Sequence, residues 1–144
     1  MLQSPPVTVD LAHDLRLTTM RLARRLRNQR ADHGLGLGQL SVLATLDRYG
    51  AMSAGALAAH EQIRPPSMTK TITALLEAGF VTRTPSLDDR RQIVVAPTPA
   101  ARQLLIEDRR RKEEWLAEHL LALEPEQLAL LSAALPVLGG LAES

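Results

Sequence analysis

The stretch "IRPPSMTKTITALLEAGF", residues 63–80, marks both ends of one short helix. Proline lacks a backbone N–H and clashes inside a helix, so Pro65 and Pro66 fit only the first turn. Gly79 suits the left-handed position that follows the last turn. The sequence therefore predicts a helix over residues 66–78.

This helix has two different faces. At 100° per residue, the large apolar side chains fall on one side: Met68, Ile72, Leu75 and Leu76. The opposite side has small and polar residues, flanked by Ser67 and Thr69: Pro66, Lys70, Thr73, Ala74 and Glu77. A short polar face with one cation near its start is typical of a surface that approaches another molecule closely.

Two further helices are expected before it. Residues 39–49 repeat leucine at helical spacing, at Leu40, Leu43 and Leu46. In "GAMSAGALAAH", Ser53 can cap a third short helix that runs to about His60. A short helix joined closely to one with an exposed polar face is the pattern of a helix-turn-helix.

The segments "FVTRT" and "QIVVA" are β-branched runs separated by "PSLDDRR", which predicts an antiparallel hairpin with a long loop. Arg90 and Arg91 fall at its tip, where Asp88 or Asp89 can hold a guanidinium through a charge-assisted bond. The DNA major groove admits a helix, and the narrower minor groove attracts arginine. The sequence therefore predicts a winged helix-turn-helix.

Leucine-rich helices flank this region. Residues 10–30 form an amphipathic pattern that "DHGLGLG", residues 32–38, ends. A long helix is expected after Thr98 as its N-cap, and a last one opens at "EPEQ", with Pro136 bending it before Gly139 and Gly140 stop it. These helices have more apolar surface than a winged-helix core can cover, so a second subunit is expected to bury the surplus.

The arginines between Arg16 and Arg30 leave three interpretations open. They form a solvated helix face, contact DNA phosphates, or make salt bridges across a dimer to three acids: Glu113, Glu114 and Glu118.

Composition narrows the function classes. The chain has 144 residues, so a single domain is expected. It has no cysteine, which excludes disulfides and thiol chemistry. A net charge of +1 gives no general attraction to nucleic acid, so DNA binding depends on local arrangement. One Trp, one Tyr and one Phe offer little surface for stacking on single-stranded bases. The N-terminus lacks a leader pattern and no apolar run approaches the roughly 20 residues that span a bilayer, so a cytoplasmic location without membrane contact is expected.

Catalytic and metal-binding patterns are absent from the sequence. The four histidines, His13, His33, His60 and His119, show no paired spacing for zinc. No nucleophile and base pair or phosphate-binding loop is evident, and "GLGLG" has no strand before it. We expect no enzyme, no cofactor and no metal.

The run "LSVLATLDRYGAMSAGALAAHEQIRPPSMTKTITALLEAGFVTR" followed by "DDRRQIVVAPT" resembles the MarR family of bacterial transcription regulators over residues 39–98. In that family the wing usually ends as Asp, any residue, Arg, then a strand and Leu-Thr. Asp89, Arg91 and Thr98 match, whereas Pro97 and Ala101 replace the usual leucine and glycine. The resemblance implies a homodimer formed by the first and last two helices, a palindromic operator, and often a small phenolic or lipophilic effector.

The expected fold is thus mostly α with a small β-hairpin wing. Its parts are residues 1–38 as N-terminal dimerisation helix and connector, residues 39–98 as winged helix-turn-helix, and residues 99–144 as C-terminal dimerisation helices. The expected DNA contacts of the recognition helix are Arg64, Pro66, Ser67, Thr69, Lys70 and Thr73, and those of the wing are Asp89, Arg90 and Arg91. As lining of an effector pocket we expect Met20, Trp115 and His119.

The expected function is a dimeric, sequence-specific binder of double-stranded DNA, acting as a repressor that a small effector releases. Two alternatives stay open: a winged-helix protein-interaction module that does not read DNA, and a metal-sensing regulator. An interaction module should expose large apolar groups on the outer face of the helix, whereas this one has Pro66, Lys70, Thr73 and Ala74 there.

Overall fold

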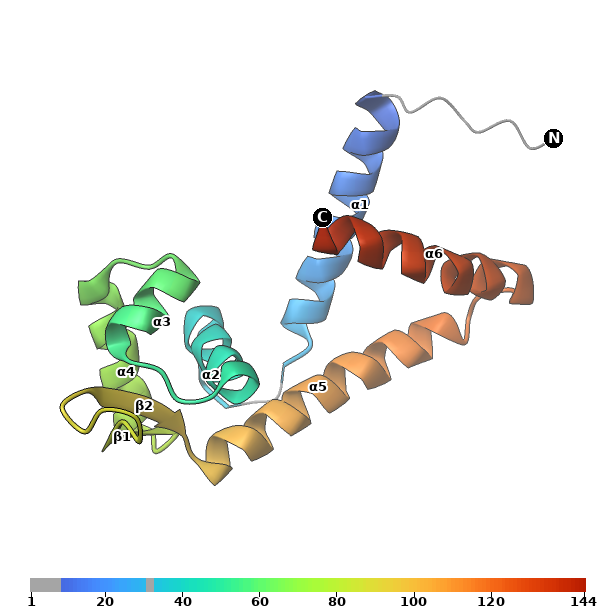
Figure 1. The fold of residues 1–144 in the computed structure, drawn as a ribbon. Coiled ribbons are helices and arrows are strands. Elements are labelled where there is room, and N and C mark those ends of the chain that lie inside the picture. The colour runs from blue at the N-terminus through green and yellow to red at the C-terminus, as the bar shows by residue number, and fades with distance from the viewer. Residues whose placement is uncertain (1–8, 31–32) are drawn as a thin grey trace. The chain divides into compact units, whose positions relative to one another are not determined.

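The computed structural model describes residues 9–30 and 33–144, which form six helices and one two-stranded sheet (Figure 1). They divide into two compact units. One unit is Arg30–Arg110, and the other combines the described part of Met1–Gln29 with Arg111–Ser144. The expected connector begins at Asp32, which lies outside the described residues.

The unit Arg30–Arg110 has the element order of a winged helix-turn-helix. Its elements are α2 (Leu37–Tyr49), α3 (Ala54–Glu61), α4 (Pro65–Glu77), β1 (Val81–Pro85), β2 (Ile93–Pro97) and the first half of α5 (Pro99–Leu120). The predicted boundaries agree with the observed ones to within one or two residues. The Ser53 hydroxyl caps α3 as expected, because its Oγ accepts the Ala56 N–H at 3.1 Å.

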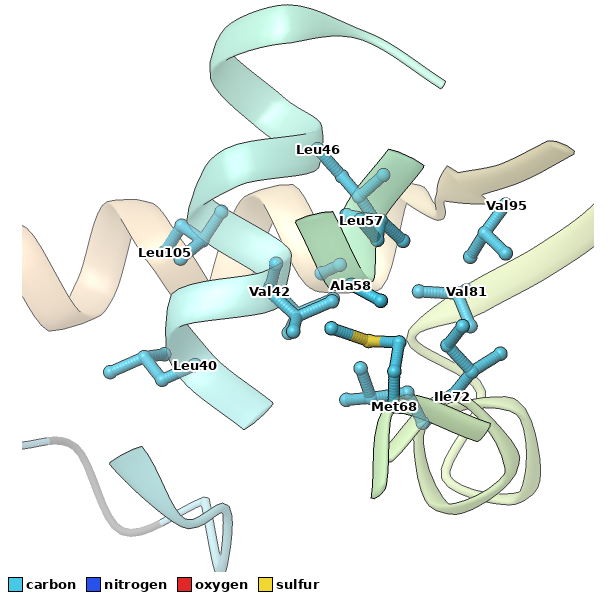
Figure 2. Packing of buried hydrophobic residues seen from close by; sticks show 13 residues of the cluster. Leu40, Val42, Leu46, Leu57, Ala58, Met68, Ile72, Val81, Val95 and Leu105 are labelled. Carbon is cyan, nitrogen blue, oxygen red and sulfur yellow. The ribbon is translucent and has the colours of Figure 1, made fainter. Parts of the chain in front are cut away.

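One apolar core holds this unit together. Figure 2 shows buried side chains from α2, α3, α4, both strands and α5 converging on the same space. On α4 the predicted inner residues Met68, Ile72 and Leu75 are 0–1% exposed, while Leu76 is partly buried. Burial of each such side chain contributes about 1.5–3 kcal/mol. The core therefore fixes which face of α4 turns outward.

The two strands form the predicted hairpin and are tied to the α2–α3 loop. They pair antiparallel, with Val81 opposite Pro97 and Pro85 opposite Ile93. Met52 adds an isolated bridge to Val95, with N···O distances of 3.1 and 2.7 Å. The base of the wing is therefore anchored to the loop before α3.

Thr98 joins the end of α4, the wing and the start of α5. Its N–H donates to the Phe80 carbonyl at 3.0 Å, and its hydroxyl donates to the Gly79 carbonyl at 2.8 Å. The same hydroxyl accepts the Ala101 N–H at 3.3 Å, which confirms the predicted N-cap. Pro97 and Ala101 fit this junction, since Pro97 ends the strand and the Ala101 methyl is fully buried.

The second unit contains α1 (Val9–Asn28), the last part of α5, and α6 (Pro125–Glu143). Neither α1 nor α6 has a buried residue. Their exposed leucines are Leu11, Leu15, Leu22, Leu128, Leu130, Leu131, Leu135, Leu138 and Leu141. The single chain therefore leaves the apolar surfaces of both helices uncovered.

The expected end of the last helix was wrong. Helix α6 continues through Gly139 and Gly140 to Glu143, with Pro136 inside it. Glycine inside a helix costs about 1 kcal/mol relative to alanine, and the neighbouring Ala and Leu residues are good helix formers. Two glycines without a following proline are thus compatible with a continuing helix.

The expectation that no segment is apolar enough to cross a bilayer was also wrong for α6. Pro125–Glu143 has 19 residues and a mean hydropathy of 1.2, which meets that requirement by length and composition. The charged residues of α6 lie near its two ends, so the long apolar segment between them was visible in the sequence. A helix whose apolar surface packs against a second protein chain has the same composition.

Candidate nucleic-acid interface

The outer side of α4 is polar over its first three turns. Pro66, Lys70 and Thr73 are exposed on one stripe, and Ser67 and Thr69 are exposed beside it. Ala74, expected on the same side, is partly buried. All six expected recognition-helix residues are exposed, with Arg64 at the N-cap position.

The threonines of α4 point their hydroxyl protons back along the helix. Thr69 Oγ1 donates to the Pro65 carbonyl at 3.0 Å, and Thr73 Oγ1 donates to the Thr69 carbonyl at 2.9 Å. Their hydroxyl protons are therefore engaged within the helix, and the exposed hydroxyl oxygens remain as acceptors. Hydroxyl oxygens accept from base amino groups, and a threonine methyl can contact the methyl of thymine.

Arg64 and Lys70 give the start of α4 its positive charge. Within the described ranges, neither forms an ion pair within 4 Å. Arg64 is exposed at the N-cap position of α4. Cations placed in this way bind phosphate oxygens.

The turn between α3 and α4 contains a feature that the sequence did not reveal. Gln62 adopts a left-handed conformation with φ 55° and ψ 43°. Behind it, the Ile63 N–H donates to the Ala58 carbonyl at 2.9 Å. Glycine or asparagine usually marks this conformation, and neither is present. Glu61, directly before the turn, bonds to α2 and was likewise missed.

The wing tip is a compact turn that exposes Arg90 and Arg91. Asp89 Oδ1 accepts the backbone N–H of Arg91 at 3.0 Å, and the Asp89 carbonyl accepts the Gln92 N–H at 3.0 Å. We expected an aspartate to bond to an arginine guanidinium, but the observed bond of Asp89 is to the backbone N–H of Arg91. Asp89 orients the backbone of the turn because its short side chain reaches the amide two residues on.

Leu87 is a further exposed residue of the tip, with 102% relative exposure. A shallow hollow of about 420 Å³ adjoins it, lined by Ala51, Thr84, Pro85, Ser86, Leu87, Asp88 and Val94. The alternation of the strands predicted neither, because Leu87 lies in the loop and the hollow combines loop residues with residues of both strands.

Two of the three expected effector residues are in contact. The Trp115 and His119 rings lie 4.0 Å apart between centroids, and His119 Nδ1 lies 2.7 Å from the Trp115 carbonyl oxygen. The Arg25 guanidinium lies 5.1 Å from the centre of the indole ring, a cation–π contact. Met20 is exposed on α1, and its sulfur accepts a weak bond from Arg16 at 3.6 Å.

In the part of the chain that the structure describes, no three acidic or histidine side chains are grouped as metal ligands. His33 instead contacts α5. Its Nδ1 accepts the Leu35 N–H at 3.0 Å, and its Nε2 lies 3.7 Å from Asp108 Oδ1, with both side chains largely buried. This contact ties the connector before α2 to α5.

The core, the exposed polar helix and the arginine-tipped hairpin together define a winged helix-turn-helix DNA-binding protein. The MarR family model matches residues 35–93. An HTH-type transcriptional regulator of Mycobacterium leprae is 44% identical over 124 residues, which cover 86% of this chain and 87% of the relative. The chain belongs to the MarR family, and its function is DNA-binding transcriptional regulation.

Solved structures agree with the fold. A transcriptional regulator protein of Pseudomonas aeruginosa has a TM-score of 0.85 at 29% identity, covering 98% of this chain and 99% of its own. BpsR of Bordetella bronchiseptica has a TM-score of 0.58 at 21% identity, covering 95% of this chain and 98% of its own. For BpsR, regulation of DNA binding by 6-hydroxynicotinic acid is described.

Proposed function

We propose that the chain acts as a homodimer on a palindromic operator. One α4 per subunit enters successive major grooves, and the two wings enter flanking minor grooves. The observation that supports this most is the polar outer side of α4 above the buried Met68, Ile72 and Leu75, followed by an arginine-tipped hairpin. A two-fold dimer reads a two-fold symmetric site.

In this proposal the residues of α4 divide into two roles. Arg64 and Lys70 contact phosphates and set the position of the helix, because they are exposed cations without an ion-pair partner among the described residues. Ser67, Thr69 and Thr73 face base edges through their hydroxyl oxygens, and the two threonines also through their methyl groups. Pro66 has no side-chain donor and allows close approach.

The wing supplies the second contact. Arg91 enters the minor groove, where narrow walls concentrate negative potential, and Arg90 contacts the adjacent backbone. Asp89 keeps the tip in shape through its bond to the Arg91 N–H. The exposure of both arginines supports this assignment.

Residues 1–38 and 99–144 supply the subunit interface in this proposal, and residues 39–98 supply DNA binding. Support comes from α1 and α6, whose leucines are exposed in the single chain. A hollow of about 430 Å³ with mainly apolar lining lies between these helices, bounded by Ala12, Leu15, Arg16, Thr19, Leu138, Leu141 and Ala142. A second copy that covers these surfaces removes a large apolar area from water.

The protein acts as a cytoplasmic repressor that a small ligand releases from DNA. Trp115 and His119 belong to the ligand site, with Met20 as a more distant lining residue, and Arg25 supplies positive charge beside the indole ring. The regulation described for BpsR supports a small-molecule effector. The cytoplasmic location follows from the proposed target, because the chromosome of a bacterium lies in the cytoplasm.

The test is selection of bound duplexes from a randomised library at about 0.15 M salt, where nonspecific binding is weak. The proposal predicts enrichment of a palindrome, protected in a footprint by the purified protein. A panel of phenols and aromatic acids is then added, and one compound should abolish the protection. If no sequence is enriched, the proposal of a palindromic operator read by α4 and the wing is wrong.

A further inference from the structure

Glu61, the last residue of α3, connects this helix to α2 through both of its carboxylate oxygens. Oε2 accepts the Ser41 hydroxyl at 2.9 Å, and Oε1 accepts the Thr45 hydroxyl. Ser41 and Thr45 are four residues apart and therefore share one side of α2. Thr45 is 8% exposed, so its hydroxyl needs a protein acceptor.

Helix α3 gains nothing by itself from an acid at this place. A negative charge at the C-terminus of a helix faces the negative end of the helix dipole. Alanine has a higher helix propensity and carries no charge. The two hydroxyl bonds offset this disadvantage, so the function of Glu61 lies in joining the helices.

The connection ends where the turn to α4 begins. Gln62 follows in the left-handed conformation, and Arg64 is already the N-cap of α4. The Ile63 N–H is held by the Ala58 carbonyl at 2.9 Å, and the Ile63 side chain packs against the core. Three residues thus separate Glu61 from Pro65, and a shift of the α3 end changes the position of the α4 N-terminus.

We propose that Glu61 is a positioning residue for DNA recognition. Its bridge to Ser41 and Thr45 fixes the angle at which the turn presents α4 to the major groove. This inference rests on the proposed function, in which α4 reads base edges. Base contacts require accurate placement, whereas nonspecific phosphate binding tolerates a small rotation.

The test is Glu61→Ala, which removes both bonds without weakening α3 itself. The measured quantity is the dissociation constant for a random duplex divided by the dissociation constant for the selected operator. Both constants are measured well below the melting temperatures of the native protein and of the variant. We expect this ratio to fall about tenfold, comparable to the loss of one base-reading contact. The affinity for random duplex should change less than about twofold, because phosphate contacts remain.

Thr45→Val removes one bond at nearly constant side-chain volume and should lower the same ratio. In the double variant the two effects should not add, since both act through one bridge. Thr45→Val also serves as the test if Glu61→Ala does not fold. Amide exchange of Gln62 and Ile63 should become faster in each variant.

Asp47→Ala is the matched control. Asp47 is also on α2 and forms an ion pair with Arg109 of α5 at 3.1 Å. Asp47→Ala therefore removes a carboxylate contact between two helices that does not involve the turn before α4. The ratio should keep its native value in this variant. A native ratio in folded Glu61→Ala and Thr45→Val overturns the positioning role alone. If the native protein itself prefers no sequence, the proposed function fails, and the positioning role fails with it.

Discussion

Gln62 shows how a single residue shapes the interface. It has a positive φ of 55°, and it stands alone in this respect among the non-glycine residues that the structure describes. A side chain in this conformation costs about 1–2 kcal/mol, because Cβ approaches the next carbonyl oxygen. The turn keeps this conformation because Glu61 and Ile63 are fixed on either side of it.

Substitutions at Gln62 should separate backbone strain from side-chain effects. Gln62→Gly relieves the backbone strain but gives the unfolded chain more freedom, and these two effects partly cancel. We therefore expect the free energy of unfolding to rise by between zero and about 1 kcal/mol. Gln62→Val should lower the free energy of unfolding by more than about 1 kcal/mol, because a β-branched residue resists a positive φ. Urea unfolding measures both. Equal stability of the two variants would contradict the left-handed turn.

Arg91 at the wing tip gives a prediction about binding. Arg91→Ala should weaken operator binding by about 1–3 kcal/mol, because a minor-groove guanidinium is lost. Fluorescence anisotropy of labelled operator measures the change, with Arg102→Ala on the exposed side of α5 as the control. Operator binding unchanged in Arg91→Ala would remove the wing from the mechanism.

At this scale the sequence predicted positions better than contacts. The period of 3.6 residues identified Met68, Ile72 and Leu75 as buried, because helix geometry alone decides which residues share a side. The bond of Asp89 to a backbone N–H was not predicted, since it depends on the shape of the turn. The bridge from Glu61 to Thr45 was not predicted either, because helical spacing does not say which side chains of two successive helices meet.

At the scale of elements, the junction around Thr98 holds α4, the wing and α5 in one arrangement. The Thr98 hydroxyl both donates to the Gly79 carbonyl and accepts from the Ala101 N–H. The wing begins two residues after Gly79 and ends one residue before Thr98. The Thr98 side chain is therefore one of the contacts that set the position of the hairpin relative to α4, together with the bridge from Met52 to Val95.

Thr98→Ala should destabilise the chain by about 1–2 kcal/mol, because it removes an N-cap and a second hydrogen bond. Chemical denaturation measures the free energy of unfolding. Thr82→Ala, on an exposed position of β1, should change this quantity by less than about 0.5 kcal/mol. An equal effect at both positions would show that the junction bonds contribute nothing.

Elements with sharp end signals were predicted well, as α4 illustrates with its two prolines and Gly79. Helix α6 was predicted to end too early, because glycine permits a stop but does not impose one. The bridge from Met52 to Val95 was missed because a single paired residue leaves no period-2 pattern.

At the scale of the whole molecule, the exposed apolar surfaces of α1 and α6 dominate. A monomer in water seldom keeps so many leucines exposed on neighbouring helices. The surplus of leucine in the sequence predicted this surface, and with it the expectation that a second subunit covers it.

Leu138→Glu should convert the protein from dimer to monomer at micromolar concentration. The reason is that a buried carboxylate without a partner strongly opposes association. Sedimentation velocity measures the change, and Leu87→Glu at the exposed wing tip is the control. A native protein that sediments as a monomer would contradict the proposed assembly.

The most direct test of DNA reading by α4 and the wing is methylation interference on the selected operator. Dimethyl sulfate methylates guanine N7 in the major groove and adenine N3 in the minor groove, so one experiment reports on both grooves. We predict interference at guanine N7 in two half-sites about 10 base pairs apart, and at adenine N3 beside each. Arg91→Ala should lose only the adenine signal. Interference confined to one groove, or unchanged in Arg91→Ala, would contradict the account.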